Sequence, residues 1–212
     1  MRQNRSNRNL RRHKPSRPPF DRVLIVCEGK KTEPNYLNEI RTLLRIAPVH
    51  LNIMQSVYGT QPLQIVECAI DEFNKTKSYE RVYAVFDRDD HETYANAIHK
   101  AEAFSAKLKN DERKPVQFIA IASVPCFELW LLLHFADVKA WLHRNEALER
   151  VKQFIPGYKK GSSDVYSCTV NLIETAAGRA KWLKGNYSRL PGNEAYTDVH
   201  ELVTYLQSLT RK

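Results

Sequence analysis

The stretch VLIVCEGKKTE, residues 23–33, decides the predicted fold. Its first five residues are apolar, include β-branched side chains and are bounded by charge, a pattern typical of a strand buried on both faces of a parallel sheet. Glu28 and Gly29 follow directly, and Thr32 is suited to cap a helix predicted over about 33–45. The stretch therefore predicts a strand, a sharp turn at the glycine and a helix, with a carboxylate where the strand ends.

The same strand–helix order repeats three more times along the chain. Such alternation predicts an α/β fold, with a mostly parallel sheet of about four strands and helices on both of its faces. After residue 136 the apolar spacing indicates helices alone, so we interpret 21–136 as an α/β core and 137–212 as a helical extension packed on it. The further predicted strands lie over about 49–57, 81–86 and 116–122, and the further predicted helices begin near residue 62 and cover about 94–104, 127–135, 138–154, 165–184 and 197–209.

Residues 1–20 carry most of the net charge of +9. Seven of the 33 basic residues and none of the 24 acidic ones lie in this segment, so the remainder, with 26 basic residues, is nearly neutral. Its richness in Arg, Asn, Ser and Pro predicts a disordered basic arm. Such an arm can bind nucleic-acid phosphates through counterion release, or can serve only to keep the chain soluble, and both interpretations stay open.

The sequence argues against a membrane, zinc or disulfide-based protein. No apolar run approaches the roughly 18 residues needed to span a bilayer, and the arginine-rich start lacks the apolar region of a secretory signal. We therefore expect a cytoplasmic protein without a membrane partner. The four cysteines are far apart and form no CxxC pair, so we expect them to be small buried apolar residues.

Acidic residues follow two of the predicted strands. Glu28 comes directly after the first strand, and Asp87 and Asp89 come after the third. Ligands of open parallel sheets gather beyond the carboxyl ends of the strands, and an extended Asp-x-Asp would direct both carboxylates to the same side. Three carboxylates held together either have raised pKa values or share a cation, and oxygen ligands suit Mg²⁺ or Mn²⁺. We predict that these three residues bind metal and are catalytic; the alternative is that they cap helices or are solvated.

These motifs resemble the Toprim fold of topoisomerases, primases and overcoming-lysogeny-type nucleases. The chain resembles one branch more closely, the RloB-like proteins, and the likeness covers about residues 20–209. It is carried by LIVCEG at 24–29, VFDRDD at 85–90 and, most distinctively, SVPCFELW at 123–130. The resemblance implies a Toprim-like fold, an association with restriction and phage-defence genes, and an RloA-like ATPase as a partner.

Four further residues are weaker candidates for the site. Glu128 lies in an apolar block, so its carboxylate is either a further catalytic group or the partner of a basic side chain. His134 is a candidate substrate-binding residue and proton carrier, or a structural histidine. Arg88 and Lys159 can bind a phosphate, or can be ordinary surface residues. Glu33 is weaker still, because an acid in the first helical turn is explained by the helix dipole.

The leading hypothesis from the sequence is a Mg²⁺- or Mn²⁺-dependent nuclease that acts as an effector in phage defence. It would hydrolyse phosphodiester bonds of DNA or RNA, tRNA included, with water as the nucleophile. The alternative is a non-hydrolytic nucleic-acid-binding or sensor subunit of an ATPase-containing defence complex. Nucleic acid, the ATPase and a second copy of the chain are the candidate partners.

Overall fold

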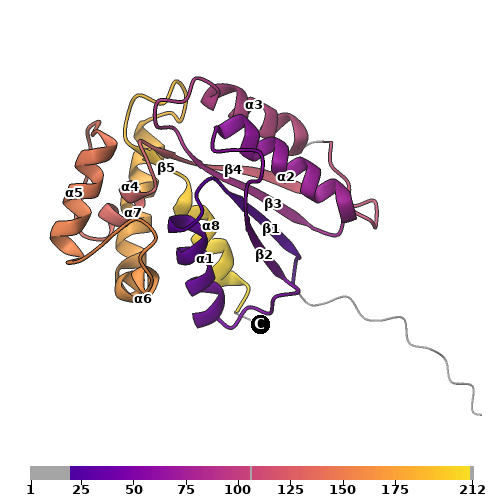
Figure 1. The fold of residues 1–212 in the computed structure, drawn as a ribbon, viewed down its shortest axis with the longest axis horizontal. Helices are drawn as coiled ribbons and strands as arrows, with labels where there is room; N and C mark the ends of the chain where they lie inside the picture. The colour runs from indigo at the N-terminus through magenta and orange to yellow at the C-terminus, as the bar shows by residue number, and fades with distance from the viewer. Residues whose placement is uncertain (1–19, 106, 211–212) are drawn as a thin grey trace, which may run out of the picture.

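The computed structural model describes residues 20–105 and 107–210, and its centre is one five-stranded sheet (Figure 1). The strands are β1 (Val23–Cys27), β2 (Leu51–Gln55), β3 (Arg81–Asp87), β4 (Gln117–Val124) and β5 (Tyr196–Thr197). Their order in the sheet is β2-β1-β3-β4-β5; the first four are parallel, and β5 pairs antiparallel with β4. The predicted α/β fold with a mostly parallel sheet is therefore confirmed.

Helices cover both faces of the sheet and gather beyond the end toward which the parallel strands run (Figure 1). They are α1 (Thr32–Leu43), α2 (Pro62–Thr76), α3 (Tyr94–Ser105), α4 (Glu128–Leu133), α5 (Arg144–Phe154), α6 (Val165–Thr169), the 3-10 turn η1 (Val170–Leu172), α7 (Ile173–Asn186) and α8 (Val199–Ser208). One face packs against α2 and α3, and the other packs against α1 and α8, while α4 to α7 lie at the strand ends.

The alternation of side chains in β1 explains its fully apolar sequence. Val23, Ile25 and Cys27 belong to the core cluster on the α1 side, whereas Leu24 and Val26 belong to the cluster on the α2 side. A polar residue within a strand that is buried on both faces would be costly, so the first polar residue after Val23 is Glu28, directly beyond the end of β1.

The cysteine prediction is correct for three of the four residues. Cys27, Cys68 and Cys126 are buried free thiols, but Cys168 is exposed. Cys168 lies on α6, a short helix with only one buried side, and its position faces solvent.

The chain after residue 136 differs from the purely helical prediction. The short strand β5 adds to the sheet edge, where Ser123 and Thr197 pair with their hydroxyl oxygens 3.1 Å apart. Helix α5 begins only at Arg144, where the His143 ring accepts a hydrogen bond from the Asn145 backbone N–H. The predicted helix over 165–184 is interrupted at η1.

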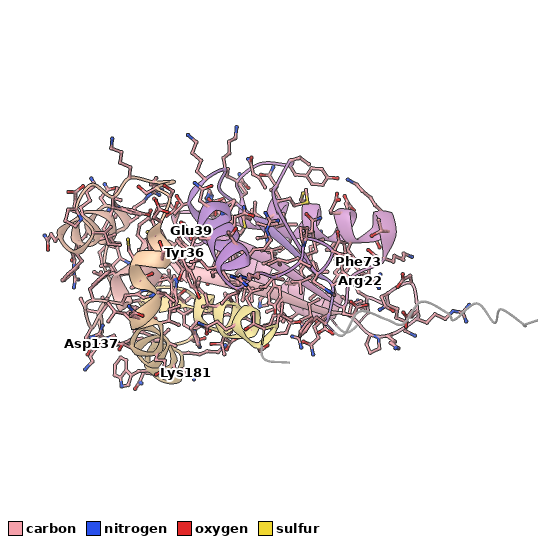
Figure 2. The ribbon with its side chains drawn as sticks, turned by 90° about the horizontal axis from the view of Figure 1, so that it is seen from below. Arg22, Tyr36, Glu39, Phe73, Asp137 and Lys181 are labelled. Carbon is pink, nitrogen blue, oxygen red and sulfur yellow. The ribbon has the colours of Figure 1, made fainter. Side chains whose placement is uncertain are left out.

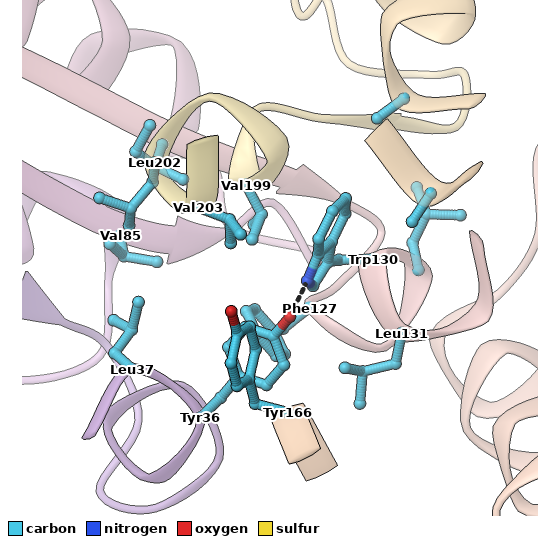
Figure 3. Packing of buried hydrophobic residues seen from close by; sticks show 14 of the residues in the cluster. Tyr36, Leu37, Val85, Phe127, Trp130, Leu131, Tyr166, Val199, Leu202 and Val203 are labelled. Atoms are coloured by element: carbon cyan, nitrogen blue, oxygen red, sulfur yellow. Dashed lines mark hydrogen bonds between the residues drawn. The ribbon is translucent and has the colours of Figure 1, made fainter. Parts of the chain in front are cut away.

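Two side chains of α1 anchor later helices: one holds α4, at the end of the α/β part, and the other holds α6, which follows that part. The Trp130 indole donates a 2.9 Å hydrogen bond to the Tyr36 hydroxyl, deep in the core that Figure 3 shows. Glu39, labelled beside Tyr36 in Figure 2, accepts hydrogen bonds from three backbone N–H groups at the start of α6, with distances from 2.9 to 3.2 Å. Apolar residues from both parts, such as Val85 and Leu183, belong to the same buried cluster.

Two sequence expectations concern the chain start and the membrane. The basic arm predicted for residues 1–20 lies outside the described residues except for Phe20, whose ring packs edge-on against His50 with centroids 5.7 Å apart. Within the described part of the chain, no helix has the length and apolarity required to cross a membrane.

Candidate metal centre and active-site cleft

A cleft of about 250 Å³ opens beyond the carboxyl ends of β1 and β3. The two strands are parallel neighbours, with Cys27 opposite Val85, so the residues that follow them emerge side by side. The cleft combines four acidic side chains from the α/β part with two basic side chains that come after residue 137. Its lining consists of Glu28, Gly29, Lys30, Lys31, Thr32, Glu33, Asp87, Asp89, Arg144 and Lys160.

Glu28 is held in place by the adjacent strand. One of its carboxylate oxygens accepts a 2.9 Å hydrogen bond from the Asp87 backbone N–H. Burial raises the pKa of the Glu28 carboxyl to about 7, and the negative charges of Glu33 and Asp89 act in the same direction. The carboxyl can therefore gain or lose a proton near neutral pH.

Asp87 is the last residue of β3, and only 7% of its surface is exposed. Its place in the strand directs it to the same face as Val85, toward α1. Burial, together with the negative charges of Glu33 and Glu28, raises the pKa of Asp87 well above its ordinary value. Two raised carboxyl pKa values in one cleft show that negative charge is concentrated there without full compensation.

Glu33 belongs to this cleft more firmly than its helical position indicated. It is 5% exposed, and burial raises its pKa, with the charge of Glu128 acting in the same direction. A Cβ atom at Gly29 would lie 2.5 Å from a Glu33 carboxylate oxygen. A larger residue at Gly29 would therefore have to displace the Glu33 carboxylate, and the φ of Gly29 is outside the left-handed region that a sharp turn would have used.

The Asp-x-Asp segment is not extended, which corrects the geometry expected from the sequence. Asp89 has φ of 39°, in the left-handed region that aspartate tolerates better than most residues. The turn still brings Asp89 into the cleft with Asp87. It also places His91 near the cleft, with its Nε2 atom 3.9 Å from a Glu28 oxygen. The sequence did not single out His91, although it lies only two residues beyond the motif.

Glu28, Asp89 and His91 form a group of candidate metal ligands. One ligand atom from each residue lies within 4.8 Å of the others. The Oδ2 atom of Asp89 is 2.7 Å from an Arg144 nitrogen, while its Oδ1 atom is buried and has no hydrogen-bond partner among the described residues. Carboxylate oxygens with one imidazole fit a divalent cation such as Mn²⁺ or Mg²⁺, and a cation here would satisfy the buried oxygen.

The loop between α5 and α6 contributes a basic residue to the cleft, and that residue is Lys160, not Lys159. Both lysines are exposed, but only Lys160 lines the cleft, where it lies 3.7 Å from a Glu128 oxygen. Burial alone would lower the pKa of Lys160, but the carboxylates of Glu128 and Asp87 outweigh it and raise the pKa. The loop is fixed next to Lys160, because Gly161 has φ of +82° and its carbonyl accepts a 2.8 Å hydrogen bond from Asn35.

Glu128 lies behind the cleft, below Lys160. It is 1% exposed, and its carboxylate accepts a 3.2 Å hydrogen bond from the Tyr158 hydroxyl. The sequence left Glu128 as either a catalytic group or the partner of a basic side chain. The structure favours the second interpretation, because Lys160 lies beside Glu128 and Glu128 does not line the cleft.

Arg88 and His134 point elsewhere. Arg88 extends toward the loop at Asn193, 3.4 Å from its side-chain oxygen. His134 is buried against Trp130, with ring centroids 4.7 Å apart, and one ring nitrogen lies 3.0 Å from the Trp130 carbonyl oxygen. Burial lowers the pKa of His134 to about 4. His134 is therefore buried and neutral, as expected of a structural histidine, and the structure does not support its predicted role as a proton carrier.

Divalent cations should stabilise the folded protein, and more strongly at about pH 8 than at about pH 6. The folded-state pKa of Glu28 is raised from 4.5 to about 7. The free energy of unfolding of the metal-free protein therefore decreases as pH rises from 4.5 to about 7, because the folded state must then ionise this buried carboxyl. A cation that binds the ionised cluster offsets this cost. Thermal unfolding with Mn²⁺, with Mg²⁺ and with chelator measures the effect.

The matched control for this experiment is Asp71→Asn, which removes an exposed carboxylate from α2 and should respond to metal like the parent. Glu28→Gln should lose most of the metal response. A metal response that is equal at both pH values, or unchanged in Glu28→Gln, would contradict a cation site at Glu28.

The fold and the cleft together define an α/β protein with an acidic site at the ends of its parallel strands, flanked by basic side chains from a later part of the chain. The chain belongs to the RloB-like protein family, whose model matches residues 23–206. The match includes every residue that lines the cleft. No curated protein and no solved structure matches the chain.

Proposed function

We propose that this RloB-like protein is a divalent-metal-dependent nuclease of the Toprim type, which hydrolyses phosphodiester bonds in nucleic acid. The observation that carries the proposal is the group of Glu28, Asp89 and His91 ligand atoms within 4.8 Å of one another, beside a cleft that Glu28 and Asp89 line together with Arg144 and Lys160. The acidic group suits a divalent cation, and the basic pair suits the phosphate of a substrate.

Glu28 and Asp89 would hold Mg²⁺ or Mn²⁺, with His91 and Asp87 beside them. The bound cation supplies Lewis acidity toward phosphate oxygens and water. Both residues offer oxygens for this purpose, and the buried Oδ1 atom of Asp89 has no other partner among the described residues. Glu28 and Asp89 therefore keep the metal-binding roles predicted from the sequence in this proposal, and His91 joins them.

The remaining groups of the cleft would bind substrate. The Asp87 backbone N–H fixes one Glu28 oxygen, which leaves the other oxygen to face the cation. Arg144 and Lys160 bind the non-bridging oxygens of the phosphate. Glu128 acts as a positioning residue, because it contacts Lys160 from behind and does not line the cleft.

The test is an incubation of the purified chain with plasmid DNA, single-stranded DNA and transfer RNA, in the presence of Mg²⁺, Mn²⁺ or chelator. Cleavage should require the metal and should fall on the order of 100-fold in Asp89→Asn, because that variant loses an anionic ligand. Asp71→Asn should cleave like the parent. Cleavage that persists in chelator, or in Asp89→Asn, would refute the proposed site.

A regulated role is favoured by the 2.7 Å ion pair between Arg144 and Asp89. This contact engages Arg144, one of the two proposed phosphate-binding side chains, so binding of a substrate phosphate would require Arg144 to release Asp89. In this second candidate function the chain is an effector or sensor subunit in phage defence, and an RloA-like ATPase controls it. The same assay separates the two: activity of the chain alone supports the free enzyme, and activity only with the ATPase supports the regulated subunit.

A further inference from the structure

Beside the acidic cleft, the segment between α4 and α5 presents an exposed tryptophan. Trp141 is 57% exposed, although its neighbour Leu142 is 2% exposed and Val138 is 4% exposed. The segment is therefore anchored in the core on either side of the indole, and the anchoring holds the ring outward. An exposed indole leaves a large apolar surface in water, which is unfavourable unless a partner covers it.

Trp141 differs from the other exposed aromatic residues of the described chain in what surrounds it. Phe154 stacks on Phe135 with centroids 5.2 Å apart, Trp182 lies under the Lys139 ammonium at 5.2 Å, and Tyr58 donates a 2.8 Å hydrogen bond to Asp71. Trp141 instead lines a small recess of about 40 Å³, and its ring is tilted against that of His143 with centroids 6.3 Å apart.

The recess and the acidic cleft are adjoining parts of one surface. Asp89 and Arg144 line both of them, so Trp141 lies one residue layer away from the proposed metal ligands. The recess also contains Arg88, whose guanidinium is a donor, and the Asp90 carboxylate, which is an acceptor. A flat apolar ring beside both donors and acceptors matches the face and the edge of a nucleobase.

We infer that Trp141 and the recess beside it bind an unpaired nucleobase of a single-stranded nucleic acid, next to the phosphate held in the cleft. The inference rests on the proposed nuclease function and specifies its substrate class. The recess is too small to enclose a base, so the base stacks on the exposed indole and only its edge reaches Arg88 and Asp90. A base paired within a duplex has no free face for this contact.

The experiment measures binding of short single-stranded DNA and RNA by fluorescence anisotropy in chelator, so that no cleavage interferes. Trp141→Ala should weaken binding about 10-fold or more, the range that loss of one stacked base produces, and Trp141→Phe should restore most of it. Trp182→Ala is the matched control, because it removes another exposed indole and should bind like the parent. Thermal unfolding verifies that each variant is folded.

Two further ligands separate stacking from a backbone contact. A strand with an abasic site at each position should bind the parent as weakly as the intact strand binds Trp141→Ala, and a duplex should bind both proteins equally. The inference would be overturned if Trp141→Ala bound single strands like the parent, or if the parent bound no single strands. It would also be overturned if Trp141→Ala weakened binding of abasic strands as much as binding of intact strands. Base-dependent binding without cleavage in Mg²⁺ or Mn²⁺ would overturn the proposed nuclease function alone.

Discussion

Asp87→Asn should make the metal-free protein more stable at about pH 8 and should reduce metal-dependent cleavage on the order of 100-fold or more. The reason is that the same carboxylate is unfavourable for folding and necessary for the cation. Burial and the charges of Glu33 and Glu28 raise the pKa of Asp87 well above its ordinary value, so holding it ionised costs free energy. Asparagine has nearly the same shape and removes the charge.

The stability gain should depend on pH. The folded-state pKa of Asp87 lies above its unfolded value, so the cost of its charge is absent below about pH 4 and increases as pH rises toward the folded-state pKa. The free energy of unfolding of Asp87→Asn should therefore exceed that of the parent at high pH and equal it at low pH. Urea unfolding in chelator at several pH values measures the difference, with Asp71→Asn as the control. A variant that is less stable than the parent at about pH 8 would show that Asp87 is well compensated.

Trp130→Ala should lower the free energy of unfolding by about 3–5 kcal/mol, the largest effect on stability expected here. Trp130 is fully buried, and its indole bonds the Tyr36 hydroxyl (Figure 3). The indole also packs against the His134 ring. The substitution removes a large apolar surface from a core that cannot collapse around the cavity, because both neighbouring helices are fixed by other contacts.

Two other variants make this expectation specific. Trp130→Phe keeps most of the ring volume but removes the indole N–H that bonds Tyr36, so it should cost less, roughly 1–3 kcal/mol. Trp182→Ala removes an indole that is 41% exposed and should change stability much less. Urea unfolding curves of the three variants test the order. If Trp130→Ala unfolds within about 1 kcal/mol of the parent, the contact between α1 and α4 is not central to the fold.

The parallel sheet could be predicted from the sequence because β1, β3 and β4 are buried on both faces and therefore mostly apolar, while the edge strand β2 alternates. Strand β5 could not be predicted, since two residues are too few to show a period of two. The late start of α5 could not be predicted either, because Val138 and Leu142 have the spacing of a helix. In the structure both residues are buried, but the segment that carries them is irregular.

The candidate site was predictable only where strand order determines position. Glu28, Asp87 and Asp89 follow strands that pair as neighbours, so the fold itself brings them to one cleft. Arg144 and Lys160 reach the same cleft from helix and loop positions more than fifty residues away in sequence, and no local pattern distinguishes them from other surface residues. Hydrogen bonds and packing of the folded chain select Lys160 over Lys159.

The cleft has two origins in the chain, and this has a consequence for how such a protein diversifies. The proposed carboxylate ligands follow the ends of β1 and β3, which the sheet fixes, whereas Arg144, Lys160 and Trp141 come from segments after residue 137. Under the proposed function, hydrolysis and substrate choice are separately mutable. Exchange of the loops around 137–143 and 156–164 would redirect the protein to a different target while its hydrolytic apparatus is inherited unchanged.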